Sequence, residues 1–429
     1  MNSKAESPML VTRRSFLESA STLTLGTALA PGISLALEEH PLSTGGKPTL
    51  VVVFLRGGMD GLNLIVPHAD EAYYDLRPNI AIPRPGTKGG ALDLDGRFGL
   101  HPAAAALAPL FDEGLAVALH AVGHARNTRS HFLEQDLWET AVADHGLATA
   151  GWLNRHLATS RGRGPVRALA LGNRLPRSLR GTVQALALRG LSDLTLPGDN
   201  QSLDATLRAM QRSYGGSQAD AGASGLLSRA GTASLDALRQ LQAVAARPYT
   251  PVVEFPDTDL GQRCAEASRL IKSDLGLELV ELDLGGWDTH QGQGGVAGNF
   301  ANNLRQLSEA LAAMVRDLQE RLDDVLIVTL TEFGRTAAQN GTNGTDHGWA
   351  SCSLILGGGL RPQGGGQPRK VLGRWPGLAP EELNQGRDLA HTTDFRDLYA
   401  ECLGFLGNSE LESVLPGHEV RPVGLLQEA

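Results

Sequence analysis

The chain has 429 residues, of which 41% are hydrophobic, and its formal net charge is −9. This length and composition allow one large hydrophobic core or two smaller ones. Acidic and basic residues are interspersed along the chain, so nucleic acid is excluded as an expected partner.

The first residues predict export from the cytoplasm. Arg13 and Arg14 in "TRRSFL" precede a weakly apolar segment that ends near "SLA" at Ala36. A basic start, an apolar stretch and a small-residue exit are the three parts of a twin-arginine signal, which we expect over residues 1–36. The apolar stretch is shorter than the ~20 residues of a membrane-spanning helix. We therefore expect a protein without a membrane anchor, passed by the twin-arginine translocase to the periplasm or the extracellular space.

Apolar runs that end in glycine alternate with helical segments along the rest of the chain. The run "PTLVVVFLRGG" (48–58) is continuous, as in a strand that is buried on both faces of a parallel sheet. Further strands are expected within 115–123, 166–172, 182–190, 277–286, 325–334 and 351–359, and helices within 101–114, 130–146, 299–322 and 392–407. This order predicts an α/β domain over 46–429, with a mostly parallel sheet sandwiched by helices and a helical insert at about 200–275.

The three cysteines, Cys264, Cys352 and Cys402, lie far apart and form no C-x-x-C motif. A zinc site built from cysteines is therefore not expected. One disulfide and free buried thiols both remain open.

Acidic residues and histidines adjoin four of the predicted strands. They are Asp60 after the first strand, Asp288 and His290 in "GGWDTH", Glu332 in "TEFGRT", and Asp346 and His347 in "GTDHGW". Each alone suits a turn or a hydrogen-bonded loop, but together they are expected at one edge of a parallel sheet, where ligands bind. Carboxylates mixed with imidazoles suit Zn²⁺, Mn²⁺ or Ca²⁺. We therefore predict one divalent metal site, with Gly285 and Gly286 allowing the sharp turn that leads to it.

Ser130 is expected at the start of a helix, and two roles are open for it. As an N-cap its hydroxyl accepts a hydrogen bond from a first-turn N–H, worth about 1 kcal/mol. As a nucleophile it lies where helix amides favour an anion and where a metal can lower its pKa. In the second case Arg129 and Arg335 can clamp an anionic ester. His131 is then a metal ligand or a base, and its alternative is a place on the helix surface.

Two of the five tryptophans, Trp287 and Trp349, stand beside the proposed metal residues. They either line a sugar or aromatic substrate or pack in the core beneath glycine-rich loops. We interpret His391, before "TTDF", as structural.

The twin-arginine start and the motifs "FLRGGMDGLN", "RSHF", "GGWDTH", "TEFGRT", "GTDHGW" and "TTDFRDLYA" together resemble a bacterial exported family of unknown function. That family is placed beside the sulfatases and alkaline phosphatases, and the resemblance covers nearly all of the chain after the signal. It implies an alkaline-phosphatase/sulfatase-like fold. It also implies a metal-binding aspartate, a nucleophile at a helix start, an Asp/His pair, an acidic strand end and a final His-Gly, which are Asp60, Ser130, Asp288 with His290, Glu332, and His347 with Gly348.

The chain departs from the wider superfamily at three points. "EFGRT" stands where the superfamily has "DHG", the D-x-H spacing at Asp288 is short, and no C/S-x-P-S-R sequence supports formylglycine.

We expect an exported metal-dependent hydrolase or transferase that acts on a phosphate, sulfate or related ester of a small molecule or glycan. The alternative is a non-catalytic exported metal- or carbohydrate-binding protein of the same fold.

The export prediction can be tested by replacing both arginines of the signal, Arg13→Lys with Arg14→Lys. Because the translocase recognises the arginine pair, the precursor should stay in the cytoplasm, as measured by cell fractionation and immunoblotting. Delivery of the double variant at the wild-type level would contradict the twin-arginine assignment.

Overall fold

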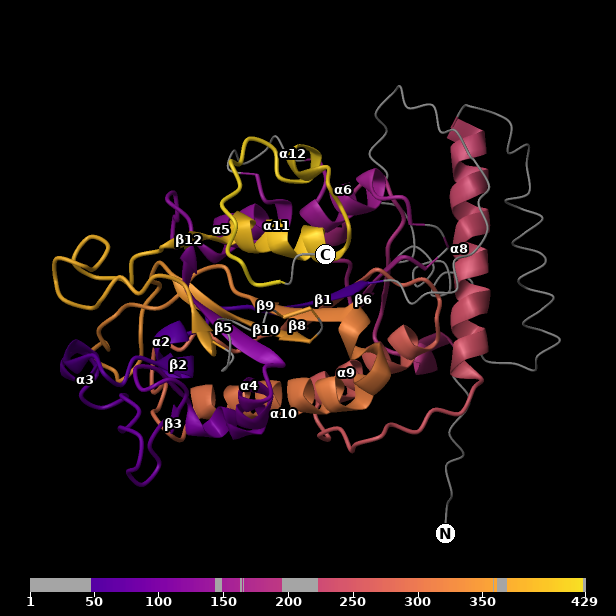
Figure 1. Cartoon of the computed structure of the whole chain (residues 1–429). Helices are drawn as coiled ribbons and strands as arrows, with labels where there is room; N and C mark the ends of the chain where they lie inside the picture. The colour runs from indigo at the N-terminus through magenta and orange to yellow at the C-terminus, as the bar shows by residue number, and fades with distance from the viewer. Residues whose placement is uncertain are drawn as a thin grey trace, which may run out of the picture.

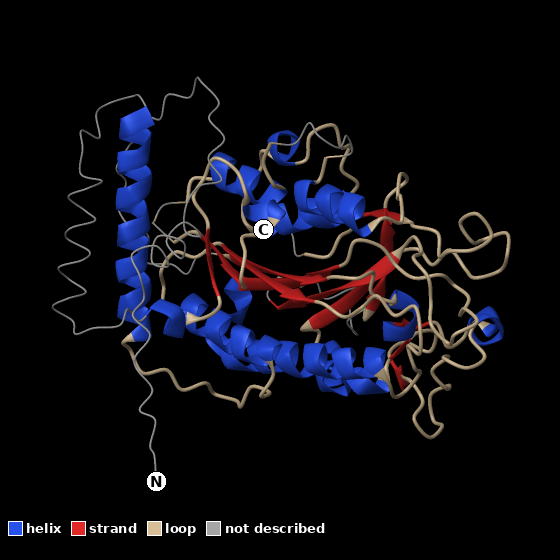
Figure 2. Ribbon diagram, turned by 180° about the vertical axis from the view of Figure 1, so that it is seen from behind, coloured by secondary structure: helices blue, strands red, loops and turns tan. Residues whose placement is uncertain are grey.

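A computed structural model of the chain describes residues 48–142, 149–162, 164, 166–194, 223–357, 359–360 and 369–426. These residues form three layers, with a central sheet between two layers of helices (Figures 1 and 2). The expected signal at 1–36 and residues 200–222 of the expected insert lie outside the described residues.

The described part of the chain contains a sheet of nine strands in the order β11-β5-β10-β9-β1-β8-β6-β7, with β12 beside β5. Its strands are β1 (Thr49–Leu55), β5 (Ala116–Gly123), β6 (Ala168–Leu171), β7 (Leu186–Leu188), β8 (Leu279–Leu284), β9 (Val325–Leu330), β10 (Ser351–Gly357), β11 (Val371–Leu372) and β12 (Thr393–Asp394). All pairings are parallel except those of β10 with β5 and β9. The predicted mostly parallel α/β sheet is therefore confirmed. A small antiparallel sheet joins β2 (Ile65–Val66), β4 (Gly99–Leu100) and β3 (Leu92–Asp93).

Helices cover both faces of the large sheet (Figure 2). One layer contains η1 (Pro102–Leu107), α4 (Ala108–Asp112), α9 (Asp259–Lys272) and α10 (Asn299–Leu318), and the other contains α5 (His131–Thr140), α6 (Trp152–Thr159), α11 (Phe395–Phe405) and α12 (Leu411–Val414). The remaining helical elements are α2 (Gly61–Leu64), α3 (Glu71–Leu76), η2 (Arg177–Leu179), η3 (Leu191–Leu194), α8 (Ala223–Ala245) and η4 (Gln319–Asp324). No helix of the described residues is both long and apolar enough to cross a membrane.

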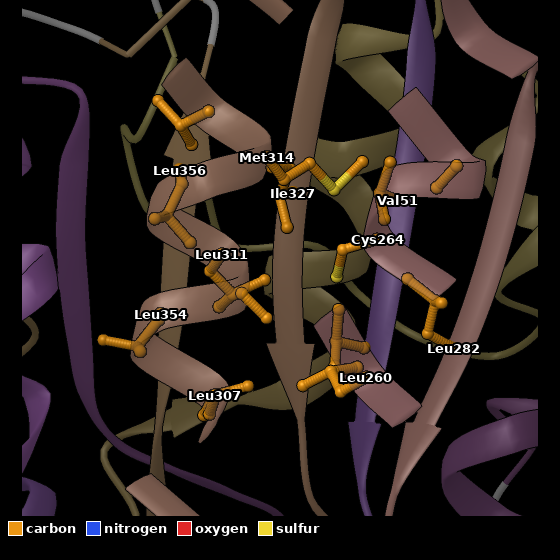
Figure 3. Packing of buried hydrophobic residues seen from close by; sticks show 14 of the residues in the cluster. Val51, Leu260, Cys264, Leu282, Leu307, Leu311, Met314, Ile327, Leu354 and Leu356 are labelled. Carbon is orange, nitrogen blue, oxygen red and sulfur yellow. The ribbon is translucent and has the colours of Figure 1, made fainter. Parts of the chain in front are cut away.

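Strand β1 is buried along its whole length, as its continuous apolar run predicts. Val51 and Val53 join the hydrophobic cluster that includes α9 and α10, whereas Val52 and Phe54 join the cluster on the opposite face. Successive side chains of a strand point to opposite faces, so both layers pack on this one strand. Figure 3 shows the first of these clusters, with Val51 beside Cys264 of α9.

Two predicted helical regions differ from expectation in extent. The helix expected over 130–146 ends at Thr140, because Ala141 adopts the left-handed conformation with φ 54°. Of the expected insert, α9 packs in the core layer through Leu260 and Cys264. Helix α8 lies at the end of the molecule opposite α2 and α3 (Figure 1).

All three cysteines are free and buried. Of the two possibilities that the sequence left open, a disulfide or free buried thiols, the structure has free buried thiols.

The reversed direction of β10 decides where residues 346 and 347 lie. In an all-parallel sheet, residues that precede a strand lie at the opposite edge from residues that follow one. Because β10 runs antiparallel to β9 and β5, its start lies at the edge where β1, β8 and β9 end. The sheet therefore brings "GTDHGW" to the same edge as the other candidate metal residues.

Candidate metal centre

Three side chains from different parts of the chain meet at this edge. His131 begins α5, Asp288 follows β8 and His347 precedes β10, and one ligand atom of each lies within 4.8 Å of the others. Asp288 Oδ1 is 3.2 Å from His347 Nε2, and Asp288 Oδ2 is 3.5 Å from His131 Nε2. His131 Nε2 is buried and has no hydrogen-bond partner among the described residues.

A third imidazole, that of His290, adjoins this group. Its Nε2 is 3.0 Å from His347 Nε2 and 3.0 Å from Asp288 Oδ1. The three Nε2 atoms and the Asp288 carboxylate thus face one another, and we call these four residues the His/Asp cluster.

The three histidines share one arrangement, in which Nδ1 faces an acceptor outside the cluster. The pairs are His131 with Glu332 Oε1 (2.7 Å), His290 with Asp346 Oδ1 (2.8 Å), and His347 with the carbonyl of Arg129 (2.8 Å). A carbonyl or an ionised carboxylate can only accept, so each Nδ1 carries a proton and donates it outward. In the neutral form of each ring the lone pair is then on Nε2, the atom that faces the cluster and can bind a cation. Outer acceptors of this kind orient the histidines of protein metal sites. Glu332 and Asp346, expected as ligands, each accept a hydrogen bond from an imidazole here.

Glu332 is a fully buried carboxylate held by donors on three sides. Its Oε1 accepts hydrogen bonds from His131 Nδ1, Gln135 Nε2 (2.8 Å) and the Gly57 N–H (2.9 Å). Burial raises the pKa of Glu332, but the hydrogen bonds from His131 and Gln135 outweigh it and keep the pKa below its ordinary value. The same hydrogen bond raises the pKa of His131. Glu332 therefore stays charged and holds the His131 ring in place.

Arg335 is buried beneath Asp288. Its Nη1 donates to Asp288 Oδ1 at 2.7 Å and to the Gly57 carbonyl at 3.3 Å, and its Nε and Nη2 donate to Thr345. Burial raises the pKa of Asp288, but the Arg335 hydrogen bond reverses that effect and lowers it. The guanidinium that we expected to clamp a substrate thus supports Asp288 instead.

Asp60 lies apart from the His/Asp cluster in a buried ion pair. Its Oδ2 accepts hydrogen bonds from Arg77 Nη1 and Gln293 Nε2, both at 2.6 Å, and its Oδ1 is buried without a partner in the described part of the chain. Gln293 accepts a hydrogen bond from Thr345 Oγ1 at 2.6 Å, and Thr345 Oγ1 accepts one from Arg335 Nε at 3.1 Å. A chain of hydrogen bonds therefore connects Asp60 to Arg335 beneath the cluster.

Ser130 precedes α5, as predicted, but its hydroxyl makes no capping hydrogen bond. Ser130 is partly buried and directly precedes His131. Because its hydroxyl is not used as a cap, the oxygen is available for another role.

Two apolar residues of α5 are exposed at this edge. Phe132 is 90% exposed, and Leu133 is 42% exposed. The sequence analysis missed this apolar rim, although two successive apolar residues at the start of a surface helix could have indicated it.

Arg129 contacts His347 of the cluster through its backbone carbonyl. Its φ of 59° is unusual for a non-glycine residue, and its carbonyl accepts the His347 hydrogen bond. Its guanidinium donates to Asp388 Oδ2 at 2.6 and 3.0 Å and lies over the Trp349 ring, 5.0 Å from its centre. Arg387 donates to the other Asp388 oxygen at 2.9 Å. No motif points to Asp388 or Arg387, so the sequence analysis missed both.

Both tryptophans pack in the protein interior. Trp287 is fully buried, donates to the Leu284 carbonyl at 2.9 Å and meets Phe300 edge-on. Trp349 is 7% exposed and donates to His391 Nδ1 at 3.3 Å. Of the two roles left open, core packing is therefore the one that the structure supports.

Residues 116–420 match the family model described as "Protein of unknown function (DUF1501)". The chain belongs to this family. The search of curated proteins gave no match.

Solved structures similar to this DUF1501 member include sulfatases and an alkaline phosphatase. The PsFucS1 sulfatase from Pseudoalteromonas sp. has 12% identity and a TM-score of 0.39, over 89% of this chain and 74% of that one. The C-terminal periplasmic domain of EcEptC from Escherichia coli has 11% identity and a TM-score of 0.38, over 88% and 89%. Alkaline phosphatase from the Antarctic bacterium TAB5 has 8% identity and a TM-score of 0.33, over 85% and 99%. At these scores the roles of individual residues follow only from this chain's own contacts.

The two glycines before Asp288 have different conformations. Gly286 has φ +89°, and a Cβ there would lie 2.8 Å from Asn303 Nδ2, whereas Gly285 has no positive φ and no atom within 4 Å of a Cβ. Only Gly286 therefore needs to be glycine for the turn into the cluster.

Gly286→Ala should lower the free energy of unfolding by about 1–3 kcal/mol, the typical cost of a strained backbone conformation. Gly285→Ala is the matched control and should change it by no more than about 0.5 kcal/mol. Urea denaturation followed by circular dichroism measures both. Equal effects at the two positions would show that the turn does not depend on Gly286.

Proposed function

We propose that this DUF1501 protein is an exported metal-dependent hydrolase or transferase that acts on a phosphate, sulfate or related ester of a small molecule or glycan. The observation that carries the proposal is the His/Asp cluster, in which three Nε2 atoms and one carboxylate face one another. The proposed export rests on the twin-arginine motif of the sequence.

The donor atoms of the cluster fit a divalent transition metal. Imidazole nitrogens suit Zn²⁺ better than Ca²⁺, which prefers oxygen ligands. His131 Nε2, buried without a hydrogen-bond partner among the described residues, becomes satisfied if it binds a cation. His131, His290, His347 and Asp288 are thus the residues proposed to hold the ion. When bound, such an ion supplies Lewis acidity, which polarises an oxygen of the ester.

Ser130 is the proposed nucleophile. Its hydroxyl is not used as a cap, it adjoins His131, and it stands at the start of the ten-residue helix α5, where first-turn amides favour an anion. In the proposed step the Ser130 oxygen bonds to phosphorus or sulfur and gives up its proton. The bond to the leaving oxygen breaks, and that oxygen takes up a proton. Water or an acceptor hydroxyl then displaces the Ser130 oxygen, which regains a proton as the transferred group leaves. The exposed Phe132 offers an apolar surface to the organic part of the ester.

A second candidate is a non-catalytic metal- or carbohydrate-binding protein of the same fold. The Asp60–Arg77 ion pair favours it, because the family resemblance implies a metal-binding role for Asp60. In this chain a buried guanidinium neutralises that carboxylate instead.

Chelation should lower the melting temperature of the wild-type protein, because an ion that binds only the folded state stabilises it by mass action, by about 2.7 kcal/mol at 100 times Kd. Asp288→Asn and His347→Ala should each lower metal content and reduce the chelator effect. His391→Ala, a histidine outside the cluster, is the control. Mass spectrometry and thermal melts measure both quantities. A wild-type protein with no stoichiometric metal after purification with Zn²⁺, Mn²⁺, Mg²⁺ and Ca²⁺ would contradict the proposal.

Ser130→Ala should abolish turnover of aryl phosphate or aryl sulfate esters. It should leave metal content unchanged and shift the free energy of unfolding by no more than about 0.5 kcal/mol, since no cap is lost. Thr258→Ala is the matched control, because Thr258 Oγ1 does cap α9 by accepting from the Gly261 N–H. That variant should lose about 1 kcal/mol of stability and keep the activity. Full activity in Ser130→Ala would remove Ser130 from the mechanism.

A further inference from the structure

Three arginines beside the His/Asp cluster, Arg335, Arg129 and Arg387, differ in their carboxylate partners and in how exposed their side chains are. Arg335 is fully buried and paired with Asp288. Arg129 and Arg387 have side chains that are 22% and 47% exposed, and both donate to the buried carboxylate of Asp388. The exposed pair, rather than Arg335, is therefore accessible to a ligand that enters the site.

The Arg129–Asp388–Arg387 group carries an excess positive charge. Guanidinium groups remain protonated in proteins, so two of them around one ionised carboxylate leave a net charge of about +1. The cluster beside it contains Asp288, whose charge Arg335 already offsets. The excess charge of the arginine pair is thus not neutralised by an ion pair within the group.

Each of the two guanidiniums also keeps a free donor. Arg129 uses Nε and Nη2 toward Asp388, with Nη2 also bonded to Gln385 Oε1 at 2.8 Å. Arg387 uses Nε toward Asp388 and Nη2 toward the His347 carbonyl. No hydrogen bond from either Nη1 is present within the described ranges. The exposed pair can therefore donate to another acceptor without breaking a contact.

The pair is held directly against the cluster. The Arg129 carbonyl accepts a hydrogen bond from His347 Nδ1, and Arg387 donates to the His347 carbonyl, so both arginines contact the same metal-site residue. The loop of Arg387 is fixed by two backbone hydrogen bonds between Asn384 and Asp388, of 2.8 and 3.2 Å, and by one from the Ala337 N–H to the Arg387 carbonyl at 3.1 Å. A clamp that is fixed before the ligand arrives binds with less loss of entropy.

We propose that Arg129 and Arg387, spaced by Asp388, form an oxyanion clamp at the rim of the His/Asp cluster, and that Arg387 is a substrate-binding residue. The inference rests on the proposed function. The sequence analysis expected Arg129 and Arg335 to clamp the ester, whereas we now assign the clamp to Arg129 and Arg387. The ligand class is a tetrahedral oxyanion, phosphate or sulfate, whose oxygens match the planar donors of a guanidinium.

The test is calorimetric titration of inorganic phosphate and sulfate into the purified full-length protein, both as purified and after chelation. Arg387→Ala should weaken binding about 10-fold or more, because hydrogen bonds to charged groups are the stronger class. Arg387→Lys should retain part of the affinity, since it keeps the charge but loses the planar fork. Arg316→Ala, which removes an exposed arginine paired with Glu113, is the control and should have no effect. Metal content should stay constant across the variants.

The outcomes separate this inference from the proposed function. Equal anion affinity in wild type, Arg387→Ala and Arg387→Lys overturns the clamp, as does a wild-type protein that binds neither anion at millimolar concentrations. Absence of metal or of turnover overturns the enzyme proposal alone, because the titration of the chelated protein still compares the arginine variants. Weaker binding in Arg387→Ala, at unchanged metal content and with normal binding in Arg316→Ala, supports the clamp.

Discussion

The Asp288–Arg335 ion pair is the contact on which the geometry of the sheet edge depends. Arg335 donates to Asp288, to the Gly57 carbonyl after β1 and to Thr345 before β10, so one buried guanidinium joins three segments that are far apart in sequence. Arg335 itself is fully buried, so loss of the half-exposed Asp288 carboxylate would leave a buried charge without its partner. The position of the Asp288 carboxylate is therefore set by the protein before any ligand binds.

Imidazoles from different elements of the fold lie around this carboxylate. His131 comes from the helix layer above the sheet, and His347 comes from the start of the antiparallel strand β10. Their Nδ1 atoms are held by Glu332 and by the Arg129 carbonyl, which leaves only Nε2 to face Asp288. The same backbone segment, residues 129–131, thus provides an acceptor, the proposed nucleophile and a proposed ligand.

Much of the fold could be predicted from the sequence, because β1 and β9 are continuous apolar runs buried on both faces. The direction of β10 could not be predicted, since a run that is apolar on both faces has the same pattern in either direction. The end of α5 was placed too late, because the left-handed turn at Ala141 has no glycine to mark it.

The four residues of the His/Asp cluster were all among the candidates that the sequence suggested, but the sequence did not give their arrangement. The sequence named Glu332 and His131 as candidates, but it could not show that they form a hydrogen bond or which ring nitrogen faces the cluster. The ion pair of Asp60 with Arg77 could not be predicted either, because Arg77 lies 17 residues away in a region without a motif. Asp388 and Arg387 could not be found, since they belong to an irregular loop whose position only the tertiary structure defines.

X-ray absorption at the metal edge of the metal-loaded protein tests the central claim most directly, because it reports the atoms that surround the ion. The account predicts nitrogen and oxygen neighbours, with the outer-shell scattering that is typical of two or more imidazole rings and no sulfur, since all three cysteines are buried away from the cluster. A shell of oxygen atoms without imidazole scattering, or a spectrum that His347→Ala leaves unchanged, would contradict it.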